Sequence, residues 1–208
     1  MAVGVICISR SVGAGGEEVG RLVAQQLGLR LVDEEIVARA AEREGLDMKE
    51  VASAEQRQSR LARILAAGGR GDPEMTGFGT FGGLGSSDPG SSEAYRELIK
   101  EAIVQTAEQG DVVIVAHAAS HALAGREGAL RVFVTASSLT RSRRLATALG
   151  VDEQTAGKRV KDSDRERADY LRRFYHVQHE LPTHYDLVIN TDTLSIEQAA
   201  SLISHAAT

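Results

Sequence analysis

The sequence predicts an α/β fold in which a parallel β-sheet is covered by helices on both faces. Apolar runs alternate with helical patterns along the chain, which is the order expected when helices connect parallel strands. Residues 111–116 form a continuous apolar run, which is typical of a strand buried on both faces. A glycine-rich loop joins the first apolar run to the first helical pattern.

Apolar periodicity and the glycines that interrupt it predict the individual elements. Strands are expected at residues 2–9, 29–33, 111–116, 130–135 and 185–190. Helices are expected at about 17–27, 34–44, 47–67, 93–109, 119–124, 138–149, 152–178 and 195–205. Gly28 and Gly110 end two of these helices, and Ser195 is a suitable N-cap for the last one.

The chain of 208 residues is long enough for one full α/β domain, and we expect a single domain over residues 1–208. Residues 68–92 hold two of the three prolines and many of the glycines. We therefore expect a mobile Gly/Ser-rich loop there, since such a segment contributes little to a core. It is too short and too central to be a linker between domains.

Composition restricts the partners. The net charge of −5 argues against a nucleic-acid polymer, whereas the Arg-rich stretch at 141–173 suits a small anionic ligand. Cys7 is the single cysteine, so no disulfide can form within the chain and a reducing compartment is expected. The chain start lacks the pattern of a signal peptide, and no apolar run is long enough for a membrane span. These features predict a cytoplasmic protein with no membrane partner.

The loop at residues 10–16 is the first candidate functional site. A strand, a glycine loop and a helix together direct backbone N–H groups and the positive helix end toward a phosphate. The standard motif is G-x-x-x-x-G-K-[ST], in which Lys reaches the outer phosphates. Aligned on residues 13–15, the Lys place is Gly16, the hydroxyl place is Glu18 and the first Gly is Arg10. Two interpretations remain open. Either this is a divergent kinase in which Arg10 supplies the positive charge of the missing Lys, or the protein keeps the nucleotide-binding fold and has lost catalytic activity.

A dinucleotide site is an alternative interpretation of the same loop. Asp33 ends a predicted strand about 20 residues after Gly13, where a ribose-binding carboxylate would lie. The pattern G-x-G-x-x-G fails, however, because the third glycine place is Glu18. A tight turn without a ligand is the remaining alternative.

Charged residues in the second half favour the phosphate interpretation. Arg141 and Arg144 are one helical turn apart, and Asp164, Arg167 and Tyr170 follow one face of a predicted helix. Phosphoryl transfer needs such cations, because charge spreads over the equatorial oxygens of the transferred group. A solvated charged helix with internal ion pairs is the competing interpretation.

Several segments together resemble the cytidylate kinase-like family, whose members are relatives of the P-loop nucleoside monophosphate kinases. The resemblance covers nearly the whole chain except residues 68–92. It rests on I-C-I-S-R-S-V-G-A-G-G-E-E-V at 6–19, L-G-L-R-L-V-D at 27–33, A-x-x-x-x-R-x-x-R at 136–144, D-x-x-R-x-x-Y at 164–170 and Y-D-L-V-I-N-T at 185–191. Members of the family share the missing P-loop Lys.

The resemblance implies a three-layer P-loop NTPase fold with a five-stranded parallel sheet, helices on both faces and an Arg-rich helical lid at about 138–178. It implies an acceptor-binding region at about 30–95. It also implies ATP-dependent phosphoryl transfer, with Mg²⁺, to a small acceptor that is most simply a nucleoside monophosphate.

The resemblance further assigns roles to single residues. Arg10, Arg141 and Arg167 are the expected catalytic residues. The donor phosphates would be bound by Ser11, Val12, Gly13, Ala14, Gly15, Gly16, Glu17 and Glu18, with Glu18 also helping to hold Mg²⁺. The acceptor would be bound by Asp33, His117, Arg144, Asp164 and Tyr170.

Two positions depart from the family pattern. After the strand at 111–116 the family usually has G-R-x-A, whereas this chain has A-H-A-A at 116–119. His117 is shorter than Arg and is mostly neutral at pH 7. Glu17 stands where relatives often carry Arg. These departures keep open a second hypothesis, a catalytically degenerate nucleotide-binding sensor or regulatory protein.

Overall fold

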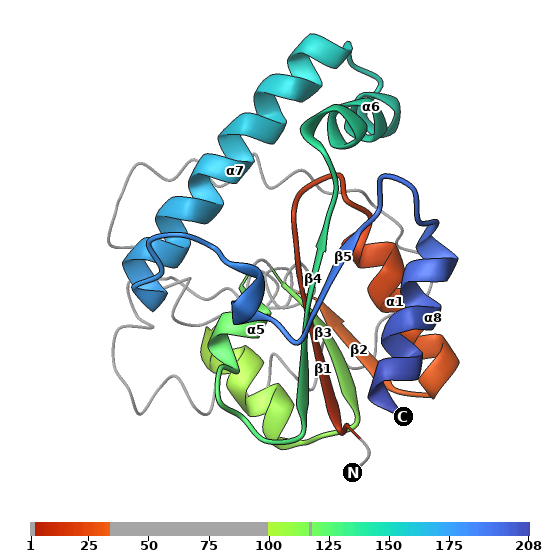
Figure 1. The fold of residues 1–208 in the computed structure, drawn as a ribbon, viewed down its shortest axis with the longest axis vertical. Helices are drawn as coiled ribbons and strands as arrows, with labels where there is room; N and C mark the ends of the chain where they lie inside the picture. Colours follow the sequence, from red (N-terminus) through yellow and green to blue (C-terminus); the bar gives the residue numbers. More distant parts are fainter. Residues whose placement is uncertain (1–2, 34–99, 117) are drawn as a thin grey trace, which may run out of the picture. The chain divides into compact units, whose positions relative to one another are not determined.

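A five-stranded parallel β-sheet in the order β2-β3-β1-β4-β5 confirms the predicted fold class (Figure 1). The strands are β1 (Val5–Arg10), β2 (Arg30–Asp33), β3 (Val112–Val115), β4 (Ala129–Thr135) and β5 (Leu187–Asn190). β1 pairs in parallel with both of its neighbours: Ile6 lies opposite Val113 of β3 and opposite Leu130 of β4. All of β1 is buried, which the apolar residues 5–8 predict and which extends to the polar Ser9 and Arg10 at its end.

The computed structural model describes residues 3–33, 100–116 and 118–208. It divides into two compact units, one with residues 1–31 and 110–208 and the other with residues 32–109. In the second unit the described residues are 32–33 and 100–109, and 100–108 are helical, as predicted. The helices predicted at 34–44 and 47–67, the acceptor-binding region between 34 and 95 and the Gly/Ser-rich loop at 68–92 lie outside the described residues.

Helices of the first unit cover both faces of its strands. They are α1 (Gly16–Leu27), α5 (Ala119–Ala122), α6 (Ser138–Leu149), α7 (Glu153–Tyr175) and α8 (Ile196–Ala207). α1 and α8 contact each other on one face, and α5 contacts β1 and β4 on the other (Figure 1). α6 and α7 pack against each other as a pair. Among the described residues, no helix combines the length and the apolar character that crossing a membrane requires.

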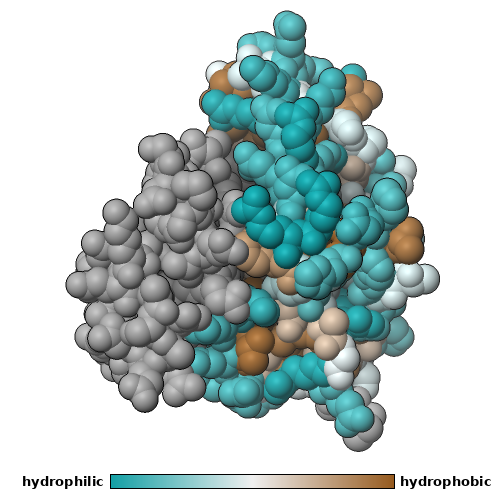
Figure 2. All heavy atoms as spheres, turned by 90° about the vertical axis from the view of Figure 1, so that its left-hand side faces the viewer, coloured by the Kyte–Doolittle hydropathy of each residue, from teal (hydrophilic) through white to brown (hydrophobic). Residues whose placement is uncertain are grey.

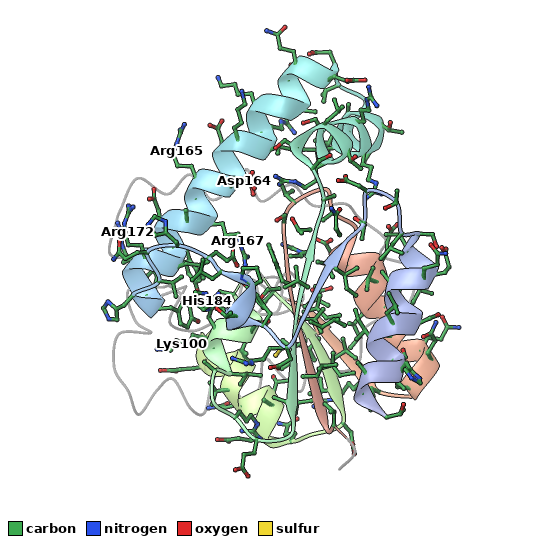
Figure 3. All side chains as sticks on the ribbon, viewed as in Figure 1. Lys100, Asp164, Arg165, Arg167, Arg172 and His184 are labelled. Carbon is green, nitrogen blue, oxygen red and sulfur yellow. The ribbon has the colours of Figure 1, made fainter. Side chains whose placement is uncertain are left out.

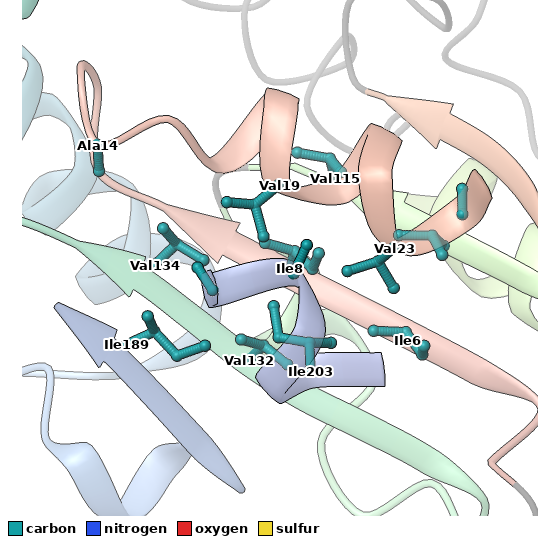
Figure 4. Close-up of a cluster of buried hydrophobic side chains, with 14 of the residues drawn as sticks. Ile6, Ile8, Ala14, Val19, Val23, Val115, Val132, Val134, Ile189 and Ile203 are labelled. Carbon is teal, nitrogen blue, oxygen red and sulfur yellow. The ribbon is translucent and has the colours of Figure 1, made fainter. Parts of the chain in front are cut away.

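The main core lies between the strands and the α1–α8 pair (Figure 4). Val19 and Val23 of α1 and Ile203 of α8 are fully buried against Ile8 and Val132 of the central strands. A smaller cluster joins α6 to α7 through Leu145, Ala146, Ala156 and Val160.

Local signals in the sequence explain most helix ends. Ser195 caps α8, as predicted: its side chain accepts from the Gln198 N–H, and Gln198 accepts from the Ser195 N–H. α7 ends at Tyr175, three residues before the predicted end, because His176 adopts a left-handed conformation with φ 56°. The Val177 N–H then returns to the Leu171 carbonyl and closes the helix.

The strand order determines where a ligand can enter the first unit. β1 has β3 on one side and β4 on the other, so the order reverses at β1. In open parallel sheets, ligands bind outside the carboxyl ends of the strands at such a point. The glycine loop after Arg10 begins there.

The α8 core contact gives a stability test. Ile203→Ala is expected to lower the free energy of unfolding by about 2–5 kcal/mol, because it removes a fully buried side chain and leaves a cavity. Leu202→Ala is the matched control, since Leu202 is exposed on the same helix and its truncation should change stability little. Urea denaturation followed by circular dichroism measures both; equal losses would contradict the assignment of this core.

Candidate functional site

The glycine loop turns sharply between β1 and α1. Gly13 and Gly15 have φ values of 76° and 81°, a region that side chains other than glycine rarely adopt. Gly15 is the N-cap of α1 and supplies no side-chain acceptor to the first helical turn. The N–H groups of that turn and the positive end of the helix dipole therefore favour an anion at this loop.

Close packing fixes the loop against two arginines. A Cβ on Gly13 would lie 2.8 Å from the Arg141 carbonyl oxygen, so the loop lies directly on the start of α6. A Cβ on Gly16 would lie 2.6 Å from the Cβ of Arg10. The position that carries Lys in the standard motif therefore has no room for a side chain.

Arg10, whose side chain occupies the space beside Gly16, supplies positive charge there. It is buried at the end of β1, and its Nε forms an ion pair with the carboxylate of Glu17. The Glu17 side chain is 50% exposed on the first turn of α1. The charge of Arg10 is thus partly balanced by a carboxylate that faces solvent.

Arg141 joins α6, the glycine loop and α7. Its Nε donates to the Ala136 carbonyl (3.0 Å), and its two terminal nitrogens donate to both oxygens of Asp164 (2.8 and 2.7 Å). Nη1 also lies 3.4 Å from the Val12 carbonyl. This bidentate arrangement orients a buried guanidinium beside the loop. Asp164 of α7 is 41% exposed.

Arg144 links the loop to the end of β5. Its Nη1 donates to the Thr191 hydroxyl (2.9 Å) and its Nη2 to the Thr191 carbonyl (2.6 Å). The Thr191 hydroxyl donates in turn to the Ala14 carbonyl at 2.9 Å. The structure therefore places Arg144 where it supports the loop, and its predicted contact with an acceptor stays a prediction.

Arg167 of α7 lies in a buried polar and aromatic cluster. Its Nε and Nη2 donate to the two carboxylate oxygens of Glu180, the former at 2.9 Å. Nη1 donates to the Arg10 carbonyl (3.3 Å), and Nη2 also donates to the Tyr185 hydroxyl (3.1 Å). The guanidinium carbon lies 4.9 Å from the centre of the Phe133 ring.

The charges in this cluster stabilise one another. Burial opposes ionisation of Glu180, yet His121 and Arg167, followed by Tyr185, favour the carboxylate and lower the pKa of Glu180 to about 2. Burial also opposes the charge of Arg167, but the hydrogen bond to Glu180 prevails and raises the pKa of Arg167. Burial raises the pKa of Tyr185, so its hydroxyl keeps the proton that it donates to Glu180.

A cavity of about 220 Å³ opens between the loop and α7. Figure 3 shows Asp164 and Arg167 on the side of α7 that faces the strands, whereas Arg165 and Arg172 point away from them. The outer face of α7 is correspondingly hydrophilic (Figure 2). The cavity is lined by Ser11, Arg141, Asp164, Arg167, Ala168, Leu171, Val177, Gln178 and Glu180.

The structure thus brings many of the predicted site residues together around the loop and the cavity. They are Arg10, the loop residues 11–18, Arg141, Arg144, Asp164 and Arg167. The Tyr170 ring instead lies 5.0 Å from Phe174 and 5.9 Å from Tyr175 and does not line the cavity. Asp33 ends β2 in the second unit, and His117 lies outside the described residues.

Sequence reasoning missed Glu180 and the partners that surround it. Glu180 lies in the irregular stretch after α7, where no periodic pattern marks it. Tyr185 is the first residue of a predicted strand and of the family-like segment at 185–191, but the sequence gives it no role, and the strand begins at Leu187. His121 Nε2 lies 3.1 Å from the Tyr185 hydroxyl. These residues are 64 positions apart, so no local sequence pattern predicts the contact.

Glu18 is the expected Mg²⁺ ligand. Its Oε2 lies 3.9 Å from the position that a Cβ on Gly15 would occupy, so the carboxylate lies beside the loop. Among the described residues, no group of three His, Cys, Asp or Glu side chains gathers as a metal-binding set. A single carboxylate fits Mg²⁺ at a phosphate site, because the ion takes its other oxygens from phosphates and water.

The ionised Glu180 predicts a dependence of stability on pH. Its pKa is lowered from the ordinary 4.5 to about 2, so its contribution is complete above pH 4.5 and is lost as the pH falls toward 2. The contribution corresponds to about 3 kcal/mol. Urea denaturation from pH 7 to pH 3 should therefore show that the difference in free energy of unfolding between wild type and Glu180→Gln becomes smaller at the acid end. A difference that stays constant over this range would contradict the buried ion pair.

Comparison with known proteins supports a kinase-like fold. The chain is similar to the cytidylate kinase of Methanoculleus marisnigri (strain ATCC 35101 / DSM 1498 / JR1), with 25% identity over 126 residues, which are 61% of this chain and 67% of that protein. A crystal structure of an uncharacterized protein from Eubacterium ventriosum superposes with a TM-score of 0.63 at 20% identity, covering 98% of this chain and 97% of the other.

A shikimate kinase from Bacteroides thetaiotaomicron has the same fold, with a TM-score of 0.54 at 17% identity and 97% of both chains covered. A model of the cytidylate kinase-like family matches residues 5–193, which include the glycine loop, the arginines and the end of β5. Since this match spans most of the chain, the protein belongs to the cytidylate kinase-like family.

Proposed function

We propose that the protein transfers a phosphoryl group from ATP to a small acceptor, most simply a nucleoside monophosphate. The observation that carries this proposal is the convergence of three arginines on one glycine loop. Arg10 enters from β1, Arg141 from α6 and Arg167 from α7. In a member of this family, such an arrangement is suited to binding the phosphates of two substrates.

The donor phosphates would bind at residues 11–18. Backbone N–H groups and the start of α1 would contact them, and Arg10 would supply the charge that Lys gives in the standard motif. Mg²⁺, held by Glu18 and by phosphate oxygens, would neutralise charge on the donor. The reaction needs no covalent intermediate with the protein, since positioning and charge stabilisation suffice for phosphoryl transfer.

The transferred group would lie near Arg141 and Arg167 in the cavity. Their guanidiniums meet the charge that develops on the equatorial oxygens. The α6–α7 pair would act as a lid that excludes water, which keeps ATP from being hydrolysed. Asp164 would orient Arg141, to which it is bonded in the structure.

The acceptor site would use the remaining predicted residues, Asp33, His117, Arg144 and Tyr170. The similarity to a cytidylate kinase makes CMP the first acceptor to test. His117 in place of Arg would weaken a contact to the acceptor phosphate, so dCMP, UMP and AMP belong in the same panel.

A second function, that of a nucleotide sensor without turnover, is favoured by one specific observation. Each of the three arginines named above is paired with a carboxylate: Arg10 with Glu17, Arg141 with Asp164 and Arg167 with Glu180. These pairs reduce the positive charge that a triphosphate meets. Tight binding of ATP with no turnover on any acceptor would support this function instead.

Arg141→Ala is expected to reduce kcat/KM for the acceptor by about 100-fold or more, because the transferred group loses a positioned cation. A coupled assay of ADP release with the monophosphate panel measures the effect. Arg165→Ala is the matched control, since Arg165 lies on the outer side of α7 with 74% of its side chain exposed. Equal activity of Arg141→Ala and wild type, both folded, would contradict the assigned role.

Gly16→Lys is expected to weaken ATP binding at least 10-fold, although it restores the Lys of the standard motif. The reason is steric, since the new Cβ would collide with the Cβ of Arg10. Thermal shift with ATP and Mg²⁺ measures the binding. Gly4→Lys is the control for a new lysine, because nothing lies within 4 Å of a Cβ at Gly4. Tighter ATP binding by Gly16→Lys would show that Arg10 does not replace the Lys.

A further inference from the structure

Glu180 differs from the other carboxylates that pair with the arginines. Glu17 is 50% exposed and Asp164 is 41% exposed, whereas Glu180 is only 23% exposed. The first two can turn toward solvent when a phosphate arrives. Glu180 has no comparable route, because burial and its hydrogen bonds hold it in place.

Several donors converge on the Glu180 carboxylate. Arg167 binds both oxygens in a fork, and the Tyr185 hydroxyl donates to Oε1. His121 Nε2 lies 3.8 Å from the same oxygen. These groups come from α7, from the stretch just before β5 and from α5, so the carboxylate is fixed by three separate parts of the first unit.

The result is a guanidinium with one orientation. Glu180 occupies the Nε–Nη2 edge of Arg167, and the Phe133 ring lies against the guanidinium, 4.9 Å from its carbon to the ring centre. Tyr185 stacks on Phe133, with 5.0 Å between ring centres, and so supports the same arrangement. The Nη1 edge then lies at the end of β1, 3.3 Å from the Arg10 carbonyl.

We propose that Glu180 is a positioning residue that holds Arg167 so that its Nη1 edge faces the carboxyl end of β1 and the cavity. This inference rests on the proposed function, in which Arg167 contacts the transferred phosphate. Tyr185 is the support of Glu180 in this arrangement. Glu180 itself does not touch the substrates and stays paired with Arg167 when they bind.

Glu180→Gln is the direct test, since it keeps the shape of the side chain and removes its charge. We expect kcat/KM for the acceptor to fall about 10- to 100-fold, because a small displacement of a positioned group costs this much. The KM for ATP should change less than twofold, since the donor loop is untouched. Glu153→Gln, at the exposed ion pair with Arg143, is the matched control and should keep wild-type activity.

A double-mutant cycle separates positioning from a merely structural role. Arg167→Lys keeps a charge but loses the fork, and in that background Glu180→Gln should cause no further loss. If the double variant instead lost kcat/KM by the product of the two single-variant factors, the inference would be overturned. Tyr185→Phe is the second variant and is expected to lower kcat/KM a few-fold, because the hydroxyl no longer holds the Glu180 oxygen. If Glu180→Gln fails to fold, an unchanged kcat/KM of Tyr185→Phe would still count against the inference.

The outcomes distinguish this inference from the proposed function. If the wild-type protein turns over and a folded Glu180→Gln variant is as active, the inference is wrong and the function stands. If Glu180→Gln is more active, Glu180 competes with the phosphate and the inference is also wrong. If the wild type turns over no acceptor, the proposed function fails and takes the inference with it.

Discussion

The contact between Arg10 and Gly16 is the constraint on which the candidate site depends. The stem of Arg10 fills the space that a side chain at position 16 would need, and β1 places this arginine at the point where the strand order reverses. The cation beside position 16 therefore comes from β1, through Arg10, and not from a side chain of α1. The same loop lies so close to α6 that Gly13 has no room for a side chain either.

This close packing explains how distant parts of the chain meet at one loop. Arg144 and Thr191 fix the Ala14 carbonyl from the side of β5, and Arg141 reaches the Val12 carbonyl from α6. These are bonds between residues more than 40 positions apart, and they hold the loop by its backbone carbonyls. A rigid loop of this kind provides backbone N–H groups that need little reorganisation when phosphates bind.

Charge balance is the second organising feature. Arg10, Arg141 and Arg167 each have a carboxylate partner, and these partners differ in how far they are exposed to solvent. Glu17 and Asp164 face solvent, so water can take over their interactions when a nucleotide enters. Glu180 is enclosed by Arg167 and Tyr185, and its role is best understood as support for the arginine. A sensor with the same pairs would bind nucleotide without transfer, which is why turnover decides between the two functions.

Features with a local physical cause were predictable from the sequence. The Ser195 cap, the Gly28 end of α1 and a buried run after Gly110 each depend on a few adjacent residues, and the structure confirms them, with the buried run at 112–116. The positions of Arg141 and Asp164 followed from helix periodicity and the family resemblance. Glu180 and His121 could not be found this way, nor could the contacts of Thr191 with Arg144 and Ala14, because the partners lie far apart in the chain and only the folded packing brings them together.

The central claim is that ATP donates its outer phosphoryl group to a nucleoside monophosphate. Phosphorus-31 NMR of the protein with ATP, Mg²⁺ and each of CMP, dCMP, UMP and AMP tests it directly, because every reactant and product has its own signals. Transfer to one of these acceptors would make ADP and one nucleoside diphosphate appear together in equal amounts. Unchanged spectra, or ADP with inorganic phosphate alone, would contradict it.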